Sequence, residues 1–185
     1  SIFTSCADKI EKTIGYSILK HVLNSAGISR FKKYEFDMVR LGIGLYGIGT
    51  TEEDKSQLIP ASTFKTIISQ IKKIKKGENI GYTGKNKTEK DSVIATLPLG
   101  YADGFSRQLG NGKGYVLIGG KKAAIIGNVC MDMCMADISE IKNVKEGDEV
   151  IVFGKGLSVE EFAVFAGTIP YEVLTSISRR VKRVY

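Results

Sequence analysis

The sequence has few of the residues that bind metals or form disulfides. Its 185 residues include one histidine, His21, and three cysteines. Cys6, Cys130 and Cys134 are odd in number and are not spaced as a disulfide framework, which fits a reducing compartment. Cys130 and Cys134 could begin a zinc site, but the sequence offers no second pair of ligands and no further histidine. It therefore argues against zinc.

Long apolar runs are also missing. No run reaches the length that spans a membrane, and no signal peptide precedes the first predicted element. We therefore expect a soluble, cytoplasmic protein without a membrane partner. The net charge of +7 comes largely from lysines dispersed between Lys65 and Lys90 and from the tail RRVKR at 179–183. Scattered lysine is typical of a solvated surface, and no aromatic-interleaved basic motif indicates nucleic acid.

Predicted helices and strands alternate in the first 50 residues, and we expect an α+β protein overall. The whole chain is 43% hydrophobic, which is enough for an ordinary core. We expect a helix at 1–13, a buried strand at 16–23, a helix at 26–34 and a strand at 38–41. This is the rhythm of parallel β/α units. Two strands cannot close a sheet or cover both of its faces. Residues 1–50 therefore predict the end of a (β/α)8 barrel whose earlier strands are missing from this chain.

The stretch FDMVRLGIGLYG, from Phe36 to Gly47, places Arg40 inside an apolar run of strand length. A buried charge is costly unless it has a fixed partner. The glycines that follow let the backbone come close to whatever Arg40 addresses. From these residues alone, a buried arginine facing a bound anion and a structural ion pair are both open.

The loops after the two predicted strands carry polar and glycine residues. In such barrels the loops after the last two strands commonly form a phosphate site. Here these loops contain Asn24 and Ser25 after one strand, and Gly42 and Ile43 after the next. A serine hydroxyl and free backbone N–H groups suit a phosphate. The alternative is that Asn24 and Ser25 only cap the following helix.

The rest of the chain predicts a linker and a second domain. Residues 51–62 are a polar linker, and residues 63–185 read as a small, mostly antiparallel β-domain, closed or nearly so. Gly119-Gly120 predicts a two-residue hairpin turn, and Ser158 with Glu161 predicts a capped helix reaching about Ala166. The expected strands are 64–74, 92–97, 114–118, 121–126, 133–138 and 148–153, although the isoleucines of the first also have helical spacing.

Six motifs in sequence resemble the pyridoxal-phosphate-dependent alanine racemases, from His21 to the end of the chain. The resemblance is to the carboxyl-terminal part of that family: the end of the barrel and the β-domain. The motifs are HVLNSAG (21–27), FDMVRLGIGLYG (36–47), GYTG (81–84), LGYADGFSR (99–107), GNVCMDMCMADIS (127–139) and PYEVLTSISRRV (170–181).

The resemblance implies cofactor contacts. Arg40 would face the pyridine nitrogen, and because arginine stays protonated it would oppose protonation of that nitrogen. His21 would orient Arg40 or be a satisfied core histidine. The residues that match phosphate contacts are Ser25, Gly42, Ile43 and Tyr171, with Asn24 as a neighbour. Without the resemblance, Tyr171 reads as a core aromatic.

The resemblance also implies that Tyr82 is a catalytic base, opposite the lysine that holds the cofactor. Its alternative is a turn aromatic, and GYTG stands where GYG is expected. Met131 would donate its backbone N–H to the substrate carboxylate; otherwise it is a packed strand end. Tyr101 would narrow the substrate channel, which selects for alanine by size. Arg107 and Ile169 match further channel residues, while Asn128 departs from the expected arginine.

The implied function is an isomerase that interconverts L- and D-alanine and supplies D-alanine for peptidoglycan. The working enzyme would be a homodimer with shared active sites. The lysine that forms the Schiff base lies upstream in the family, and its motif is missing here, so we expect the chain alone to be inactive. A racemase of another small amino acid, such as serine, and a non-catalytic β-barrel binding module remain open.

Overall fold

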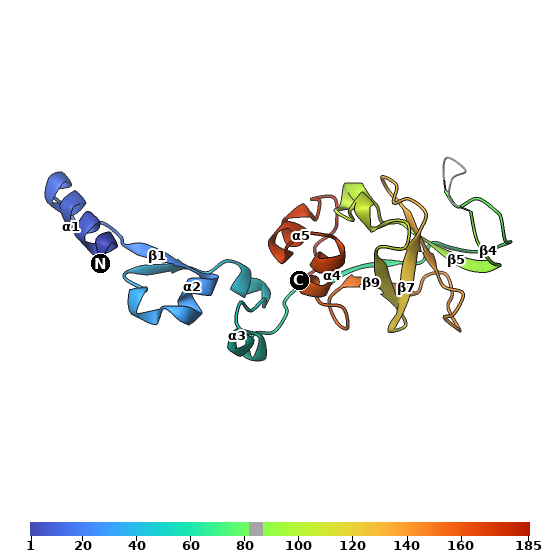
Figure 1. Cartoon of the computed structure of the whole chain (residues 1–185), viewed down its shortest axis with the longest axis horizontal. Helices are drawn as coiled ribbons and strands as arrows, with labels where there is room; N and C mark the ends of the chain where they lie inside the picture. Colours follow the sequence, from blue (N-terminus) through green and yellow to red (C-terminus); the bar gives the residue numbers. More distant parts are fainter. Residues whose placement is uncertain (82–86) are drawn as a thin grey trace. The chain divides into compact units, whose positions relative to one another are not determined.

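The computed structural model describes residues 1–81 and 87–185 of the chain. It divides into two compact units, Ser1–Ser62 and Thr63–Tyr185. Each unit is built around its own sheet (Figure 1).

The first unit contains two parallel strands joined by a helix. The helix α1 (Ile2–Ile14) begins at its N-cap Ser1. The strand β1 (His21–Asn24) pairs in parallel with β2 (Met38–Arg40), and between them lie α2 (Ser25–Arg30) and the 3-10 helix η1 (Lys32–Tyr34). The barrel remnant is thus confirmed as a short parallel sheet. The expected strand 16–23 was too long at its start, because the three-residue β2 offers a partner only to the end of that stretch.

The expected linker contains a short helix, α3 (Glu52–Gln57). Thr51 Oγ1 accepts a hydrogen bond from Asp54 N–H at 3.1 Å, and Asp54 Oδ2 accepts one from Thr51 N–H at 3.1 Å. This reciprocal capping box fixes the first turn of the helix. The polar composition that favoured a linker is therefore the composition of an exposed, capped helix.

The second unit is a curled, antiparallel, seven-stranded sheet, as expected for a β-domain. Its strands occur in the order β3-β9-β6-β7-β8-β5-β4. The strands are β3 (Phe64–Ile67), β4 (Gln70–Ile74), β5 (Ser92–Leu97), β6 (Tyr115–Ile118), β7 (Lys121–Ile126), β8 (Cys134–Asp137) and β9 (Glu149–Phe153).

The stretch 64–74 forms two strands rather than the single expected strand. The first, β3, pairs with β9, whereas β4 pairs with β5 at the opposite edge of the sheet. Between them, Ile68 N–H donates to Asp148 O at 3.0 Å, and Ser69 N–H donates to Thr96 O at 2.9 Å. The chain therefore passes directly from one edge of the sheet to the other. This continuity accounts for the curl.

Local signals placed the turn and one of the two helices correctly. Gly119 and Gly120 have φ of 55° and 75° and join β6 to β7. The helix α4 (Val159–Phe165) has Ser158 as its N-cap. The sequence did not indicate α5 (Pro170–Ser176), a seven-residue helix that is rich in β-forming residue types and begins with proline.

Part of the core of the second unit lies between α4 and the sheet at β9. The Phe162 ring of α4 meets the Phe153 ring edge-on and the Phe105 ring at a tilt, with ring centroids 5.7 Å and 6.1 Å apart. Phe105 is fully buried, and α4 also packs against α5 (Figure 1). This packing fixes the loop that follows β5 and the loop that precedes β8, which carry Tyr101 and Met131 respectively.

Candidate functional site

The first group of candidate residues lies where β1 and β2 end. Ser25 is buried, and its Oγ accepts hydrogen bonds from Gly42 N–H at 3.0 Å and from Gly44 N–H at 3.4 Å. The two strand ends are therefore joined through one hydroxyl. Since that oxygen accepts both bonds, its own proton remains available to donate.

Asn24 has the capping role that the sequence left open. Its Oδ1 accepts a hydrogen bond from Gly27 N–H at 3.0 Å at the start of α2. The side chain of Asn24 is thus engaged with the helix, whereas Ser25 faces Gly42. Ile43 begins the 3-10 helix η2 (Ile43–Tyr46) and is 3% exposed.

Arg40 is the last residue of β2, and its side chain is exposed rather than buried. The expectation of a buried arginine was wrong for this unit, because a sheet of two strands does not cover its own faces. Its Nη2 donates to Val22 O at 3.4 Å. Within residues 1–81 and 87–185 it makes no ion pair with a carboxylate, so the structural ion pair is not observed. His21 is exposed too, so it is not a core histidine.

A second group of candidates gathers around a pocket of about 270 Å³ in the β-domain. Tyr101 and Met131 line it and are 43% and 54% exposed. Tyr101 N–H donates to Cys130 O, and Ala102 N–H donates to Met131 O, both at 3.0 Å. The structure therefore brings Tyr101 and Met131 together. The pocket is completed by Arg107, Cys130, Asp132 and Met133.

The close approach of these two loops depends on Gly100. A Cβ placed on Gly100 would lie 2.2 Å from Met131 O and 2.4 Å from Cys130 O. Any side chain there would separate the loops. Nearby, Asn128 Oδ1 accepts a hydrogen bond from Asn111 Nδ2 at 3.2 Å, so its side chain is engaged with the preceding turn.

Ile169 and Tyr171 lie at the start of α5. Ile169 is the N-cap residue, and the two side chains are 59% and 47% exposed. Tyr171 is therefore not a core aromatic, which is how it reads in the sequence without the family resemblance. Neither residue lines the 270 Å³ pocket, although both lie in the same unit as Tyr101.

The two cysteines next to this pocket differ in environment. Cys134 in β8 is fully buried, and burial raises the pKa of its thiol to about 12. Cys130 is partly exposed. In the part of the chain that the structure describes, no cluster of three histidine, cysteine or acidic residues is arranged to hold a metal.

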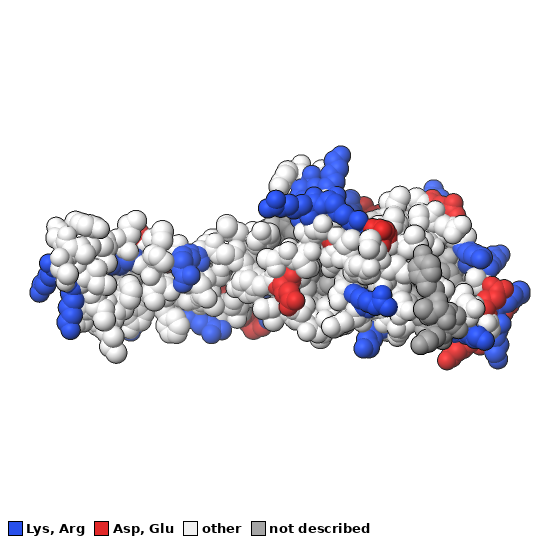
Figure 2. Space-filling view, turned by 90° about the horizontal axis from the view of Figure 1, so that it is seen from above, with Lys and Arg blue, Asp and Glu red and all other residues white. Residues whose placement is uncertain are grey.

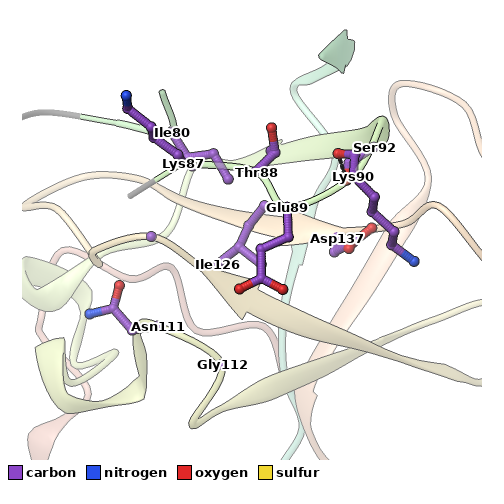
Figure 3. Close-up of a pocket in the computed structure, with 11 residues that line it drawn as sticks. Ile80, Lys87, Thr88, Glu89, Lys90, Ser92, Asn111, Gly112, Ile126 and Asp137 are labelled. Carbon is purple, nitrogen blue, oxygen red and sulfur yellow. Dashed lines mark hydrogen bonds between the residues drawn. The ribbon is translucent and has the colours of Figure 1, made fainter. Parts of the chain in front are cut away.

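Tyr82, the expected base, lies outside the described residues. A hollow of about 760 Å³ lies beside Ile80 and Lys87, with Ile126 and Asp137 on adjacent strands (Figure 3). The residues that line it include two lysines, Lys87 and Lys90, and two acidic residues, Glu89 and Asp137, so their formal charges cancel. Figure 2 likewise shows basic side chains interspersed with acidic ones, apart from one denser basic group. The described residues that line the hollow therefore have balanced formal charges.

Comparison with known proteins identifies the family. The family model "Alanine racemase, C-terminal domain" matches residues 61–185, and "Alanine racemase, N-terminal domain" matches residues 1–50. The chain belongs to the alanine racemase family. An alanine racemase from Desulforamulus reducens is 48% identical over 179 residues, which cover 95% of this chain and 48% of that protein.

Solved alanine racemases have the same fold. The enzyme from Clostridium difficile 630 in complex with cycloserine is 42% identical, with a TM-score of 0.85 over 96% of this chain and 48% of that one. The enzyme from Bartonella henselae with covalently bound pyridoxal phosphate is 31% identical, with a TM-score of 0.82 over 100% of this chain and 52% of that one. The chain thus spans about half the length of the alanine racemases it matches. None of its described helices is long and apolar enough to cross a membrane.

The donor set at the ends of β1 and β2 fits the phosphate of the cofactor that this alanine racemase fold implies. A serine hydroxyl and main-chain N–H groups at a helix start are suitable partners for a phosphate. Here Gly42 N–H and Gly44 N–H converge on Ser25 Oγ, which leaves the Ser25 hydroxyl proton as the free donor, and Arg40 ends the adjacent strand.

Sequence reasoning missed three charged residues beside the Tyr101 loop. Asp103, Asp132 and Arg180 form ion pairs in the structure. A local signal was present for Asp103, since an aspartate three residues after Gly100 can cap the turn. Arg180 had none, because it stands in a basic tail that reads as solvated surface.

Proposed function

We propose that this chain is the carboxyl-terminal part of an alanine racemase, a pyridoxal-phosphate-dependent isomerase that interconverts L- and D-alanine. The observation that carries the proposal is the junction of Ser25, Gly42 and Gly44 beside Arg40, on a chain of this family. The known structures with cycloserine and with covalent pyridoxal phosphate support it.

The residues at the strand ends would hold the cofactor. The Ser25 hydroxyl and the Ile43 N–H would bind its phosphate, joined by the Gly42 N–H when the phosphate replaces Ser25 Oγ as its acceptor. The family resemblance adds the Tyr171 hydroxyl, and Asn24 keeps α2 in place. When bound, pyridoxal phosphate supplies an electron sink for negative charge at the substrate α-carbon. Arg40 would donate to its ring nitrogen and oppose protonation there. A weaker sink favours rapid return of the proton over transamination.

The β-domain would supply the groups that handle the substrate. Tyr82 would remove or return the proton on one face of the α-carbon, opposite a lysine from upstream of this chain. The Met131 N–H would bind the substrate carboxylate. Tyr101, with Arg107 and Ile169, would narrow the entrance and favour alanine by size. We place the enzyme in the cytoplasm as a homodimer that supplies D-alanine for peptidoglycan.

Arg40→Glu in the full-length protein tests the central role of Arg40. A carboxylate there would favour the protonated ring nitrogen, so we expect racemisation to fall by at least about tenfold and the share of transamination to rise. D-alanine and pyruvate formed from L-alanine are measured together, with Arg40→Lys as the charge-conserving control. An unchanged ratio of pyruvate to D-alanine would contradict the role.

The chain alone provides a second test. Because the cofactor lysine is expected upstream, residues 1–185 should not racemise alanine. After incubation with one equivalent of pyridoxal phosphate and borohydride, no particular lysine should be labelled stoichiometrically. A single stable adduct on one lysine of this chain would overturn that expectation. Assaying the full-length protein on alanine and serine separates an alanine racemase from a serine racemase.

A further inference from the structure

Arg180 joins two loops of the candidate site. Its Nε donates to Asp103 Oδ1 and its Nη2 to Asp132 Oδ1, each at 2.7 Å. The Asp103 side chain is 13% exposed, whereas those of Asp132 and Arg180 are 56% and 45% exposed. One guanidinium thus bridges a nearly buried carboxylate and a more exposed one. Both hydrogen bonds raise the pKa of Arg180, that to Asp103 more strongly.

Each carboxylate belongs to a loop that carries a candidate substrate residue. Asp103 Oδ2 accepts a hydrogen bond from Gly100 N–H at 2.8 Å, which closes the turn around Tyr101. Asp132 directly follows Met131 and lines the same pocket as Tyr101. The loops are also joined by the backbone bonds from Tyr101 N–H to Cys130 O and from Ala102 N–H to Met131 O.

The carboxyl-terminal tail is folded so that Arg180 reaches both loops. Ser178 N–H donates to Asp103 O at 3.2 Å. Arg183 braces the tail by donating to the carbonyl oxygens of Ile177 at 2.9 Å, Ser178 at 2.5 Å and Val181 at 2.7 Å. The geometry is therefore specified by several bonds and not by one surface ion pair.

We propose that Arg180 is a positioning residue that fixes Tyr101 and the Met131 backbone relative to each other, and so sets substrate affinity and size preference. The inference rests on the proposed function of those two residues. Arg180 does not line the pocket; it acts through Asp103 and Asp132. Without the guanidinium, two carboxylates on adjacent loops would lose their shared counter-ion. A planar guanidinium can bond both at once, whereas a lysine ammonium is a single point of charge.

The test is Arg180→Gln in the full-length racemase, compared with Arg179→Gln, which removes the same charge from the neighbouring exposed residue. We expect the KM for alanine to rise about three- to tenfold with kcat changed less than about twofold, and the preference for alanine over serine to fall by a similar factor. Arg180→Lys should recover part of both effects. Arg179→Gln should behave like the parent.

The outcomes separate this inference from the proposed function. A parent protein without racemase activity contradicts the proposed function. An active parent with unchanged KM and alanine preference in Arg180→Gln overturns the role of Arg180. If the melting curve shows that Arg180→Gln does not fold, Asp132→Asn decides, because it retains the Asp103 pair. An alanine preference unchanged in Asp132→Asn would then overturn the inference.

Discussion

Burial distinguishes individual side chains that look alike in the sequence. Cys130 and Cys134 are four residues apart and suggest a ligand pair, yet one is partly exposed and the other is fully buried in β8. Arg40 shows the converse case: an apolar neighbourhood predicted burial, and the structure leaves it exposed. In each case the deciding factor is what packs above the residue, which its neighbours in sequence do not specify.

The first prediction concerns thiol reactivity. The thiolate is the reactive form, and burial holds the pKa of Cys134 at about 12, so at pH 8 it should be alkylated at least about a hundredfold more slowly than Cys130. Iodoacetamide labelling followed by peptide mass spectrometry measures both residues in one sample. Labelling in denaturant is the control and should remove the difference. Equal rates in the native protein would contradict the assigned burial.

The second prediction concerns Asp54 at the start of α3. Hydrogen bonds from Ser29, then from Thr50 and Thr51, lower its pKa to about 2, against an ordinary value of about 4. The folded-state pKa is depressed, so this stabilisation is present above about pH 4 and is lost as the pH falls towards 2. Hydrogen-exchange protection of the α3 amides should therefore be lower in Asp54→Asn than in the parent at pH 7.

The same comparison near pH 2.5 is the control for Asp54. There the parent carboxyl is partly protonated, so the difference between parent and Asp54→Asn should shrink. A difference that stays constant across this range would contradict the charge-dependent cap. Glu53→Gln, an exposed change in the same turn, should leave protection nearly unaltered.

Two short elements with their own end signals followed the sequence closely, whereas α3, which also has a capping box, formed where a linker was expected. The capped helix after Ser158 and the Gly119-Gly120 turn formed where expected, because their bonds join residues only a few positions apart. The stretch 64–74 did not, because its two halves bond to β9 and β5, which come much later in the chain. The sequence of such a stretch does not show at which residue the backbone stops pairing with one distant strand and begins to pair with another.

The third prediction tests the hairpin. Gly120 has φ of 75°, and a Cβ placed on it would have no atom within 4 Å beyond its chain neighbours, so a side chain there meets only backbone strain. Gly120→Ala should therefore destabilise the protein by about 1 kcal/mol in urea unfolding. Gly120→Asn is the matched control and should cost less, because asparagine tolerates this conformation. Equal losses would show that the backbone strain is not the cause.

The two units differ in how many buried apolar side chains they contain. Among the described residues, the first unit contributes Ala7, Leu23, Ile43 and Ile48 to the buried apolar side chains, and all the others belong to residues 63–185. The first unit also exposes Leu19, Val22, Leu41 and Leu45. Hydrophobic burial is the main favourable contribution to folding, so the stability of the chain should reside in its second unit.

The fourth prediction follows from that imbalance. Residues 63–185, produced without 1–62, should fold and melt cooperatively, within roughly 5 °C of the main transition of the whole chain. Circular dichroism measures the transition, and an amide NMR spectrum tests for fixed packing. Residues 1–62 alone are the comparison and should show no cooperative transition. A second unit that melts without a transition would contradict this division of the core.

The sequence by itself determined the helix cap at Ser158, the glycine turn, most strand positions and the family motifs, since each depends on residues close together in the chain. Only the tertiary structure decided that 64–74 spans two sheet edges, that Arg40 is exposed and that Arg180 holds Asp103 and Asp132 together. The first and third depend on segments of the second unit that meet only after its sheet has curled, and the exposure of Arg40 depends on what covers the two-stranded sheet of the first unit. Their geometry is set by packing between distant residues, which local propensity does not encode.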